Sequence, residues 1–580
     1  MKLTKYIAIT IIALMILAVL SGCQIQDENL DMEDNIEDDI EAIVEYTPEF
    51  GGQIVVPLTN FDTLNPLMTE NSSYYFFSKL IFEGLFEFDE DLNIKTQLAK
   101  SYSIKDHGRT IEIELMDEIY WHDGEKLTPE DVQFTINTIK YADIDSTYNQ
   151  MFSKALGSFS PSDLRRIIDI KIIEDMTFEI TFDRAFNNNL EVLTFPIIPK
   201  HLFETTKGGN KDYASALEVN NYTPIGTGPF VFQSYEKMKQ ITLIANDNYR
   251  RSRPYIDNIT GKVLENEEDI LTAFETGQIN MATTIGVDWD KYKQNNRIKT
   301  YEFVSNNYEF LGFNFKNEVF SEENGNNLRK AMVYGIDRQS IIQNLYLGHG
   351  TQIDVPIHPD SWLLSSKSNT YGYNLELAKS EIMKLGFEDT DGDGILEDQE
   401  GNKLSFRLLT NSYNLMRMKT AELIKNDLAK LGIEITIFPE GKRSDELTAE
   451  DIEEQWKEVN DVLISGDYDI ALLGWQISVI PDLSFAFHSS QIGYNTNFIN
   501  YSSENMNQLL EKAFLDGNRG NKVKAYDKIQ ELIVDELPYI SLFFKNKALL
   551  LDKKIVGDLE PTFFNPYKGI ENVFIPKDLQ

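Results

Sequence analysis

The chain alternates short apolar segments, which predict strands, with stretches whose apolar residues recur every three or four positions, which predict helices. The predicted strands include residues 53–58, 110–115, 404–409, 433–438 and 469–473. The predicted helices include 375–385, 417–431, 505–514 and 522–534. Strands that alternate with helices favour an α/β fold, in which helices cover a sheet.

The segment from Tyr308 to Ile342 joins a predicted buried strand to a predicted helix. Residues 310–315 carry apolar side chains on both faces of an extended segment, with Asn314 as the polar exception. After a polar Asn-Gly-Asn-Asn break, apolar residues return at helical spacing from Leu328 onward. Taken alone, these residues are also explained by an ordinary buried strand and helix.

Length and charge narrow the class of protein. At 580 residues the chain is several times longer than a single core requires, so two or three lobes are expected. The net charge of −39 argues against nucleic acid as a partner and disfavours direct contact with an anionic membrane surface. The single cysteine, Cys23, excludes an intrachain disulfide and a thiolate zinc cluster.

The position of Cys23 explains its presence. Two lysines precede the apolar run Ile7–Leu20, which is shorter than a bilayer span and leads into Leu-Ser-Gly-Cys. This pattern predicts a secretory signal over residues 1–22 and resembles a bacterial lipobox. The resemblance implies that Cys23 is diacylated and becomes the N-terminus, and an uncleaved membrane anchor is the alternative.

Residues 23–47 are predicted to form an acidic tether. From Gln24 to Glu45 the chain carries ten acidic residues and no basic one. Repulsion between these charges favours an extended, unfolded spacer. The break at Pro48–Gly52 then precedes the first predicted strand of the folded body.

Motifs in every third of the chain are similar to those of one protein family. They comprise the block from Phe86 to Ile136, Pro224–Phe230, Tyr308–Ile342 and Gly474–Asp482. On these residues the chain resembles the bacterial extracellular solute-binding proteins of the peptide and nickel type, family 5. The segment after Gly474 is similar to the long-oligopeptide-binding branch of that family.

The resemblance implies a two-lobed α/β clamp of the periplasmic-binding-protein type II class, with an extra small domain in the first lobe. Lobe I is expected to be discontinuous, and the chain is expected to cross between the lobes near Tyr308 and again near Phe544. The implied boundaries are 48–88, 222–308 and 545–580 for lobe I, 89–221 for the extra domain and 309–544 for lobe II.

The function implied by the resemblance is capture of an oligopeptide between hinged lobes and its delivery to an ABC-type permease. The protein is expected to be a monomer on the extracellular face of the membrane, held by lipid, or in the periplasm of a Gram-negative host. Nickel, haem or an oligosaccharide as ligand, or a role as a surface peptide-signal receptor, remain alternatives. An enzyme is not expected, because the chain has no GxSxG motif and its six histidines are scattered.

Six residues are predicted to contact the ligand, and they cluster at predicted strand ends and motif positions. They are Trp475, Gln476, Asp482, Asn314, Tyr308 and Asn65. Trp475 follows a buried strand, where open α/β sheets commonly bind ligands, although core packing would also explain it. Residues 476–480 contain no carboxylate, so the aspartate that clamps the free amine of short peptides in some family members is not expected here. This favours longer peptides, bound by backbone hydrogen bonds.

The loop from Asp389 to Glu400 fits the spacing of a calcium-binding loop. Oxygen-bearing side chains occupy its first, third, fifth, ninth and twelfth positions, and glycine occupies the sixth. The candidate ligands are Asp389, Asp391, Asp393, Glu397 and Glu400. A solvated acidic turn explains the same residues and is favoured by their location between a helix and a strand, so no resident cofactor is expected unless calcium binds here.

Overall fold

The computed structural model describes most of the chain beyond the predicted tether. The described residues are 46–61, 63–69, 71–141, 167–185, 187–204, 206–207, 210–211, 213, 223–284, 289–321, 324–366, 368–439, 448–480, 482–493 and 496–580. Thr47–Gln580 forms one compact unit. The predicted signal, Cys23 and nearly all of the tether lie outside the described residues, among which no helix is long and apolar enough to cross a membrane.

A four-stranded sheet forms the base of lobe I. Its strand order is β1 (Gln53–Leu58), β12 (Asn258–Val263), β11 (Gln240–Ala245) and β10 (Phe230–Glu236). Only the pair β1–β12 is parallel. The core beneath the sheet includes Leu551, Ile555 and Val573 from the end of the chain, which is consistent with the expected place of the C-terminal segment in lobe I.

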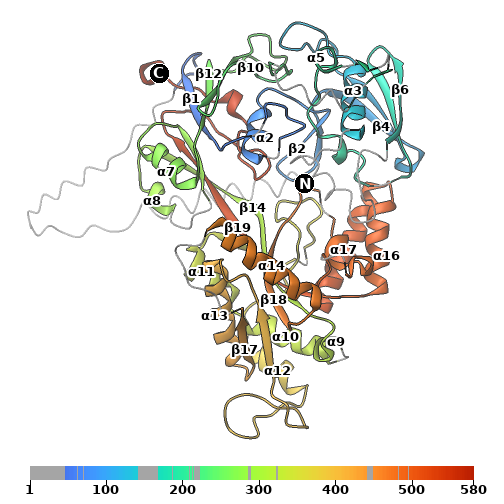
Figure 1. The fold of residues 1–580 in the computed structure, drawn as a ribbon, viewed down its shortest axis with the longest axis vertical. Helices are drawn as coiled ribbons and strands as arrows, with labels where there is room; N and C mark the ends of the chain where they lie inside the picture. The colour runs from blue at the N-terminus through green and yellow to red at the C-terminus, as the bar shows by residue number, and fades with distance from the viewer. Residues whose placement is uncertain are drawn as a thin grey trace, which may run out of the picture. The chain divides into compact units, whose positions relative to one another are not determined.

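A second sheet belongs to the segment predicted as the extra domain. Its order is β4 (Ala99–Lys105), β5 (Thr110–Leu115), β7 (Thr177–Phe182) and β6 (Ile167–Glu174), all antiparallel. Helix α3 (Pro129–Tyr141) packs beside it, and the hairpin of β2 (Phe86–Phe88) and β3 (Ile94–Thr96) leads into it (Figure 1). Two-residue strands β8 (Thr206–Lys207) and β9 (Asn210–Lys211) pair separately, and α5 (Lys200–Phe203) precedes them.

The third sheet has seven strands and contains the largest core. Its order is β13 (Met281–Thr284), β19 (Tyr539–Asp552), β14 (Ile298–Phe313), β18 (Ile470–Gln476), β16 (Ser405–Leu409) and β17 (Glu434–Phe438), with β15 (Gly350–Gln352) on β19. Helix α7 (Glu267–Glu275) contacts β13, helix α8 (Asp290–Lys293) contacts β14, and the short helix α9 (Glu318–Ser321) contacts α10 (Gly325–Gly335). The helices of lobe II are α10, α11 (Arg338–Tyr346), α12 (Leu375–Met383), α13 (Leu415–Ala429), α14 (Ala449–Ser465), α15 (Ser484–Phe487), α16 (Glu504–Leu515) and α17 (Arg519–Glu536). Helices packed on a mixed sheet confirm the predicted α/β class.

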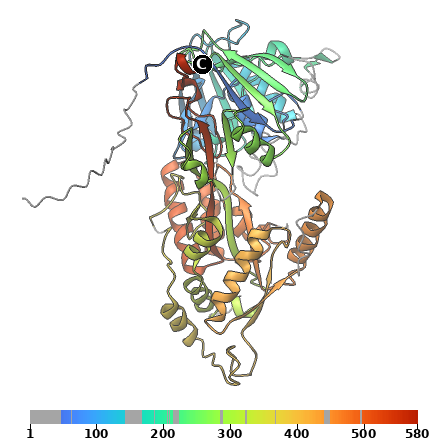
Figure 2. The same cartoon turned by 90° about the vertical axis from the view of Figure 1, so that its left-hand side faces the viewer.

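The long strands β14 and β19 connect lobe I to lobe II. Figures 1 and 2 show both strands running from the region of β1 and β12 toward β18. Their antiparallel pairing joins Val304 to Asn546, then shifts register and resumes with Tyr308 opposite Phe544. The register shift thus lies where the chain was expected to cross, while the exact boundaries of the lobes stay a prediction.

Two features of lobe II differ from the pattern-based expectation. The apolar spacing from Leu328 to Ile342 belongs to two helices, α10 and α11, because the backbone is extended at Ile336 and Asp337 caps the second helix by accepting from Ser340 N. Helix α14 lies in the polar, acidic stretch after residue 443, where the apolar pattern led us to expect no helix. Its start is a capping box, in which Thr448 and Asp451 each accept a backbone N–H of the other.

Candidate ligand-binding site

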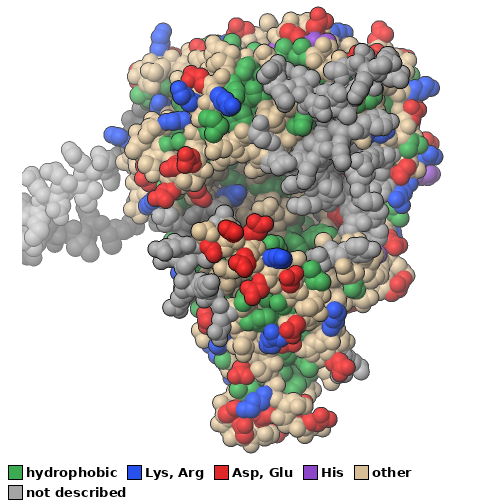
Figure 3. Space-filling view, in the orientation of Figure 1, with side chains coloured by type: hydrophobic (Ala, Val, Ile, Leu, Met, Phe, Trp, Pro, Cys, Tyr) green, Lys and Arg blue, Asp and Glu red, His purple; other side chains and the backbone are tan. Residues whose placement is uncertain are grey.

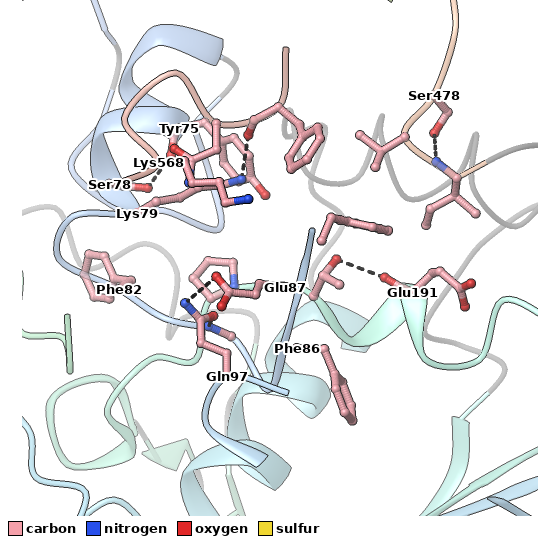
Figure 4. A pocket seen from close by; sticks show the side chains of 18 residues that line it. Tyr75, Ser78, Lys79, Phe82, Phe86, Glu87, Gln97, Glu191, Ser478 and Lys568 are labelled. Carbon is pink, nitrogen blue, oxygen red and sulfur yellow. Dashed lines mark hydrogen bonds between the residues drawn. The ribbon is translucent and has the colours of Figure 1, made fainter. Parts of the chain in front are cut away.

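An open cavity lies between lobe I and the segment that follows β18. Its empty volume is about 970 Å³, including the solvent at its mouth. Figure 4 shows the side chains around it. The lining residues are Tyr75, Ser78, Lys79, Phe82, Gly84, Phe86, Glu87, Phe88, Gln97, Glu191, Thr194, Pro196, Ser478, Val479, Ile480, Phe564, Asn565 and Lys568. The mixture of aromatic and polar walls suits an organic ligand.

One wall of the cavity is the end of helix α2 (Ser72–Ser78) and the residues after it. Asn71 caps this helix by accepting from Tyr74 N at 2.9 Å. The loop 224–230 then holds the following turn, since Gly228 N donates to the carbonyl of Ile81 at 2.8 Å. A Cβ on Gly226 would lie 1.8 Å from the same oxygen, so only glycine allows the two backbone segments to approach this closely.

Two lysines, Lys79 and Lys568, line the cavity. Lys79 donates to the carbonyl of Phe564 at 2.8 Å and lies 5.2 Å from the ring centre of Tyr75. Burial lowers the pKa of Lys79 to about 8, and Glu87 opposes this shift. Burial also lowers the pKa of Lys568, but hydrogen bonds to Glu90 and Glu560 outweigh it and leave that pKa raised.

Across the cavity, Glu191 supplies a buried carboxylate (Figure 4). It begins the short helix η3 (Glu191–Leu193) and is 3% exposed. Its Oε1 lies 3.0 Å from Arg519 Nη1 and 3.8 Å from Lys522 Nζ, both on α17. Its Oε2 has no hydrogen-bond partner among the described residues. A buried acceptor without a partner is costly, and this one belongs to a side chain that lines the cavity.

Lobe II contributes the segment Ser478–Ile480, which leaves the end of β18. Ser478 Oγ accepts from Ile480 N at 3.2 Å, which turns the chain immediately beyond the strand. This strand end is where ligand contacts are expected from the sequence. Because Ser478–Ile480 line the cavity together with residues of lobe I, segments from both lobes line one cavity.

Two predicted ligand residues lie just before this segment. Trp475 is half-buried against Phe310, Phe485 and Phe498, with ring centres 6.0, 5.2 and 5.8 Å away. Gln476 is exposed at the last position of β18. Neither is among the residues that line the cavity, so a ligand contact by Trp475 or Gln476 stays a prediction.

Asp482 lies near a second, smaller cavity of about 220 Å³, lined by Asn188, Asp482, Leu510, Ala513, Phe514, Lys522 and Tyr526. Its Oδ1 accepts from Ser484 N at 2.9 Å. Burial raises the pKa of Asp482, whereas burial lowers that of Lys522. The structure thus brings Asp482 close to Lys522, which also contacts Glu191.

The other three predicted ligand residues are buried and bonded within the protein. Asn314 donates to the carbonyls of Gly466 and Tyr468 at 3.0 and 2.8 Å. Tyr308 shares a 2.5 Å hydrogen bond with Ser541. Asn65 accepts from Leu67 N at 3.0 Å, and its Nδ2 has no partner among the described residues. Their predicted contact with a ligand remains untested.

The acidic loop brings together four of its five candidate ligands. The carboxylates of Asp389, Asp391, Asp393 and Glu397 lie close to one another. Glu400 is not in this group; its backbone N–H donates to Asp398 Oδ1 at 2.8 Å in the next turn.

Lys79, Lys568 and Glu191 were not predicted as site residues. Lys79 follows an apolar helix and Glu191 follows three asparagines, and neither pattern is distinctive. The one available signal for Glu191 is a charged residue inside an otherwise apolar stretch from Leu190 to Ile198. Its role depends on α17, more than 300 residues away.

The comparisons with known proteins agree with this architecture. The model of the bacterial extracellular solute-binding proteins, family 5 Middle, matches residues 93–497. The chain belongs to family 5. Among its family 5 relatives, the oligopeptide-binding protein AppA of Bacillus subtilis is 29% identical over 532 residues, which cover 91% of each chain. The heme-binding protein A of Haemophilus influenzae is 23% identical and covers 87% of this chain and 89% of its own.

Solved family 5 structures share the fold. AppA of Bacillus subtilis in complex with a nonapeptide has a TM-score of 0.61 and 26% identity, covering 92% of this chain and all of its own. NikZ of Campylobacter jejuni in complex with Ni(L-His) has a TM-score of 0.59 and 24% identity, covering 88% and 95%. The predicted two-lobed fold and the family assignment are thereby confirmed, and the family comprises solute-binding proteins.

Proposed function

We propose that this protein binds oligopeptides in the cavity between its lobes and delivers them to an ABC-type permease. The observation that carries the proposal is the open cavity of about 970 Å³ lined by both lobes. The similarity to AppA, which was solved with a nonapeptide, supports an extended peptide as the ligand. Closure of the lobes then shifts an existing equilibrium toward the form that the peptide prefers.

The cavity walls match the chemistry of a peptide backbone. Glu191, Lys79 and Lys568 line the cavity and carry groups that can pair with the N–H, carbonyl and carboxylate groups of a peptide. Phe86, Phe88 and Phe564 supply apolar surface for side chains. Such a site recognises backbone and general apolar character rather than one sequence.

Calorimetric titration of the full chain with peptides of three to twelve residues tests the proposal. We expect saturable binding of longer peptides and none of comparable strength for Ni(L-His), haem or an oligosaccharide. Nickel and haem are included because relatives are named for them. If one of these ligands bound and no peptide did, the peptide assignment would be wrong.

We further propose that the mature chain starts at a lipid-bearing Cys23 and is held on the outer face of the membrane. The lipobox-like Leu-Ser-Gly-Cys sequence and the acidic spacer after it support this proposal. The spacer carries no basic residue that would hold the protein against anionic lipid.

Delivery to the permease is tested by transport activity of the whole assembly, measured as uptake of a labelled peptide with and without the protein.

A further inference from the structure

The loop between α12 and β16 gathers carboxylates at the end of lobe II that is farthest from β14 and β19 in Figure 1. One ligand oxygen from each of Asp389, Asp391, Asp393 and Glu397 lies within 4.8 Å of the others. Oxygens bound to calcium at about 2.3–2.6 Å are separated by at most about 5 Å. The four oxygens therefore have the spacing of one coordination shell.

Glu397 differs from the three aspartates because it is buried. It is 4% exposed, whereas the aspartates are exposed. Its Oε2 accepts from the backbone N–H and the hydroxyl of Thr390, both at 2.8 Å, and its Oε1 has no partner among the described residues. A buried, unpartnered carboxylate oxygen is unfavourable unless a cation or donor faces it. A solvated acidic turn does not require this burial.

The backbone on both sides holds Glu397 in place. The backbone of Glu397 forms isolated antiparallel β-bridges with Glu388 and with Lys403. The backbone N–H of the neighbouring Leu396 donates to the carbonyl of Gly432 at 2.9 Å. Leu396 also packs against the large core of lobe II. The backbone of the loop is thus fixed at Glu397 to the segments that precede β16 and β17.

Lys403 is the cation that now faces the group. Its Nζ lies 3.3 Å from Asp391 Oδ2 and pairs with Asp393 Oδ2. Four carboxylates and one ammonium leave three negative charges uncompensated. The side chain of Lys403 is 39% exposed, so the ammonium group is free to move into solvent when a stronger cation arrives. Figure 3 shows acidic and basic side chains together at this end of the protein.

We propose that Asp389, Asp391, Asp393 and Glu397 bind one calcium ion, which displaces the ammonium group of Lys403. Calcium fits better than magnesium because the loop offers several carboxylates in irregular positions, whereas magnesium requires near-octahedral geometry and retains water. The ninth position of the loop supplies the buried ligand, and Glu400 at the twelfth position does not take part.

Calorimetric titration of the full chain with CaCl2, after EDTA has been removed by dialysis, tests the site. We expect one saturable site with a Kd of about 10⁻⁵ to 10⁻³ M, the range of sensor and extracellular sites, and at least tenfold weaker binding of MgCl2. Glu397→Gln is expected to weaken calcium binding at least tenfold, and the matched control Glu400→Gln to change it less than threefold. Asp391→Asn, at an exposed position, is expected to weaken binding by a similar factor if Glu397→Gln does not fold.

Lys403→Gln gives a change in the opposite direction. Because the ammonium group competes with calcium for Asp391 and Asp393, its removal is expected to strengthen calcium binding about threefold or more. The proposal would be overturned by the absence of saturable calcium binding to the unmodified chain, by equal affinity for magnesium, or by Glu400→Gln weakening binding as much as Glu397→Gln does.

Discussion

Glu191 combines a fixed oxygen and a free one, and it lines the cavity. Arg519 lies 3.0 Å from Oε1, and Oε2 has no hydrogen-bond partner among the described residues. Glu87 also lines the cavity, but Arg251 and Gln97 lie 3.1 and 3.4 Å from its two oxygens. The two residues therefore form a matched pair for testing contact with a peptide.

We expect Glu191→Gln to weaken peptide binding about tenfold, which corresponds to about 1.4 kcal/mol, because a charge-assisted hydrogen bond is lost. Glu87→Gln is expected to change the affinity less than threefold. Calorimetric titration with one bound peptide measures both. Equal effects of the two substitutions would remove Glu191 from the ligand contacts.

The free amine of the peptide is not expected to dominate binding. Residues 476–480 carry no carboxylate, and Glu191 already lies beside Arg519 and Lys522, which weaken its attraction for an ammonium group. We therefore expect N-terminal acetylation of a bound peptide to change its affinity less than tenfold, about 1.4 kcal/mol. A hundredfold loss in titrations of the same peptide would show that a carboxylate clamps the amine.

His358 links the protonation state of one side chain to the stability of the fold. It is buried between Phe544 and Phe563, and burial lowers its pKa to about 4. In the unfolded chain its pKa is about 6.5. Below pH 6.5 the unfolded state therefore binds the proton more readily than the folded state, so folding stability is lost as the pH falls from 6.5 toward 4.

The lower pKa of His358 in the folded state reduces the free energy of unfolding by about 3 kcal/mol at pH 4 or below. His358→Gln is expected to make the melting temperature less sensitive to acid over that range. Parallel pH profiles for the unmodified protein and His358→Gln would contradict the prediction.

At the scale of elements, one buried ion pair joins helix α11 to the sheet. Arg338 is 2% exposed and contacts Asp354 Oδ1 at 2.6 Å, the carbonyl of Ser541 on β19 at 2.8 Å and the carbonyl of Tyr371 at 2.5 Å. Asp354 also accepts from Tyr371 N at 2.8 Å. The pair thus connects α11 and the segments around Asp354 and Tyr371 to the distant strand β19.

Removal of one partner leaves the other charge buried and uncompensated. We expect Arg338→Met to lower the free energy of unfolding by about 3–5 kcal/mol, measured by denaturant titration. Lys293→Met, in an exposed pair 2.8 Å from Asp290, is expected to cost less than about 1 kcal/mol. Similar losses for both variants would show that the buried pair has no special role.

At the scale of the whole molecule, the folded unit and its predicted anchor are separate parts. The unit begins at Thr47, and Cys23 lies outside the described residues. Cys23→Ser is expected to release the protein from the membrane fraction, because two acyl chains give stable anchoring. Its melting temperature should match that of the unmodified chain. Retention of the variant in washed membranes would contradict lipid anchoring at Cys23.

Local pattern was sufficient wherever a residue's structure depends on its neighbours in the chain. The alternation in 110–115 and the apolar runs at 53–58 and 404–409 predicted β5, β1 and the whole of β16, because side-chain periodicity within a strand is set by the backbone itself. Helix α14 was missed because its surroundings are strongly polar and only its capping box is distinctive. The family, and with it the two-lobed fold, also followed from motifs in the sequence.

Tertiary structure alone decided which of these elements meet. Periodicity cannot register Tyr308 against Phe544, nor join Glu191 to Arg519 across the cavity, because such contacts depend on chain segments hundreds of residues apart. The acidic loop shows the same division. Its spacing was visible in the sequence, but the burial of Glu397 and the exclusion of Glu400 depend on how the loop is fixed to the segments that precede β16 and β17, and a residue's burial is a property of everything that packs around it.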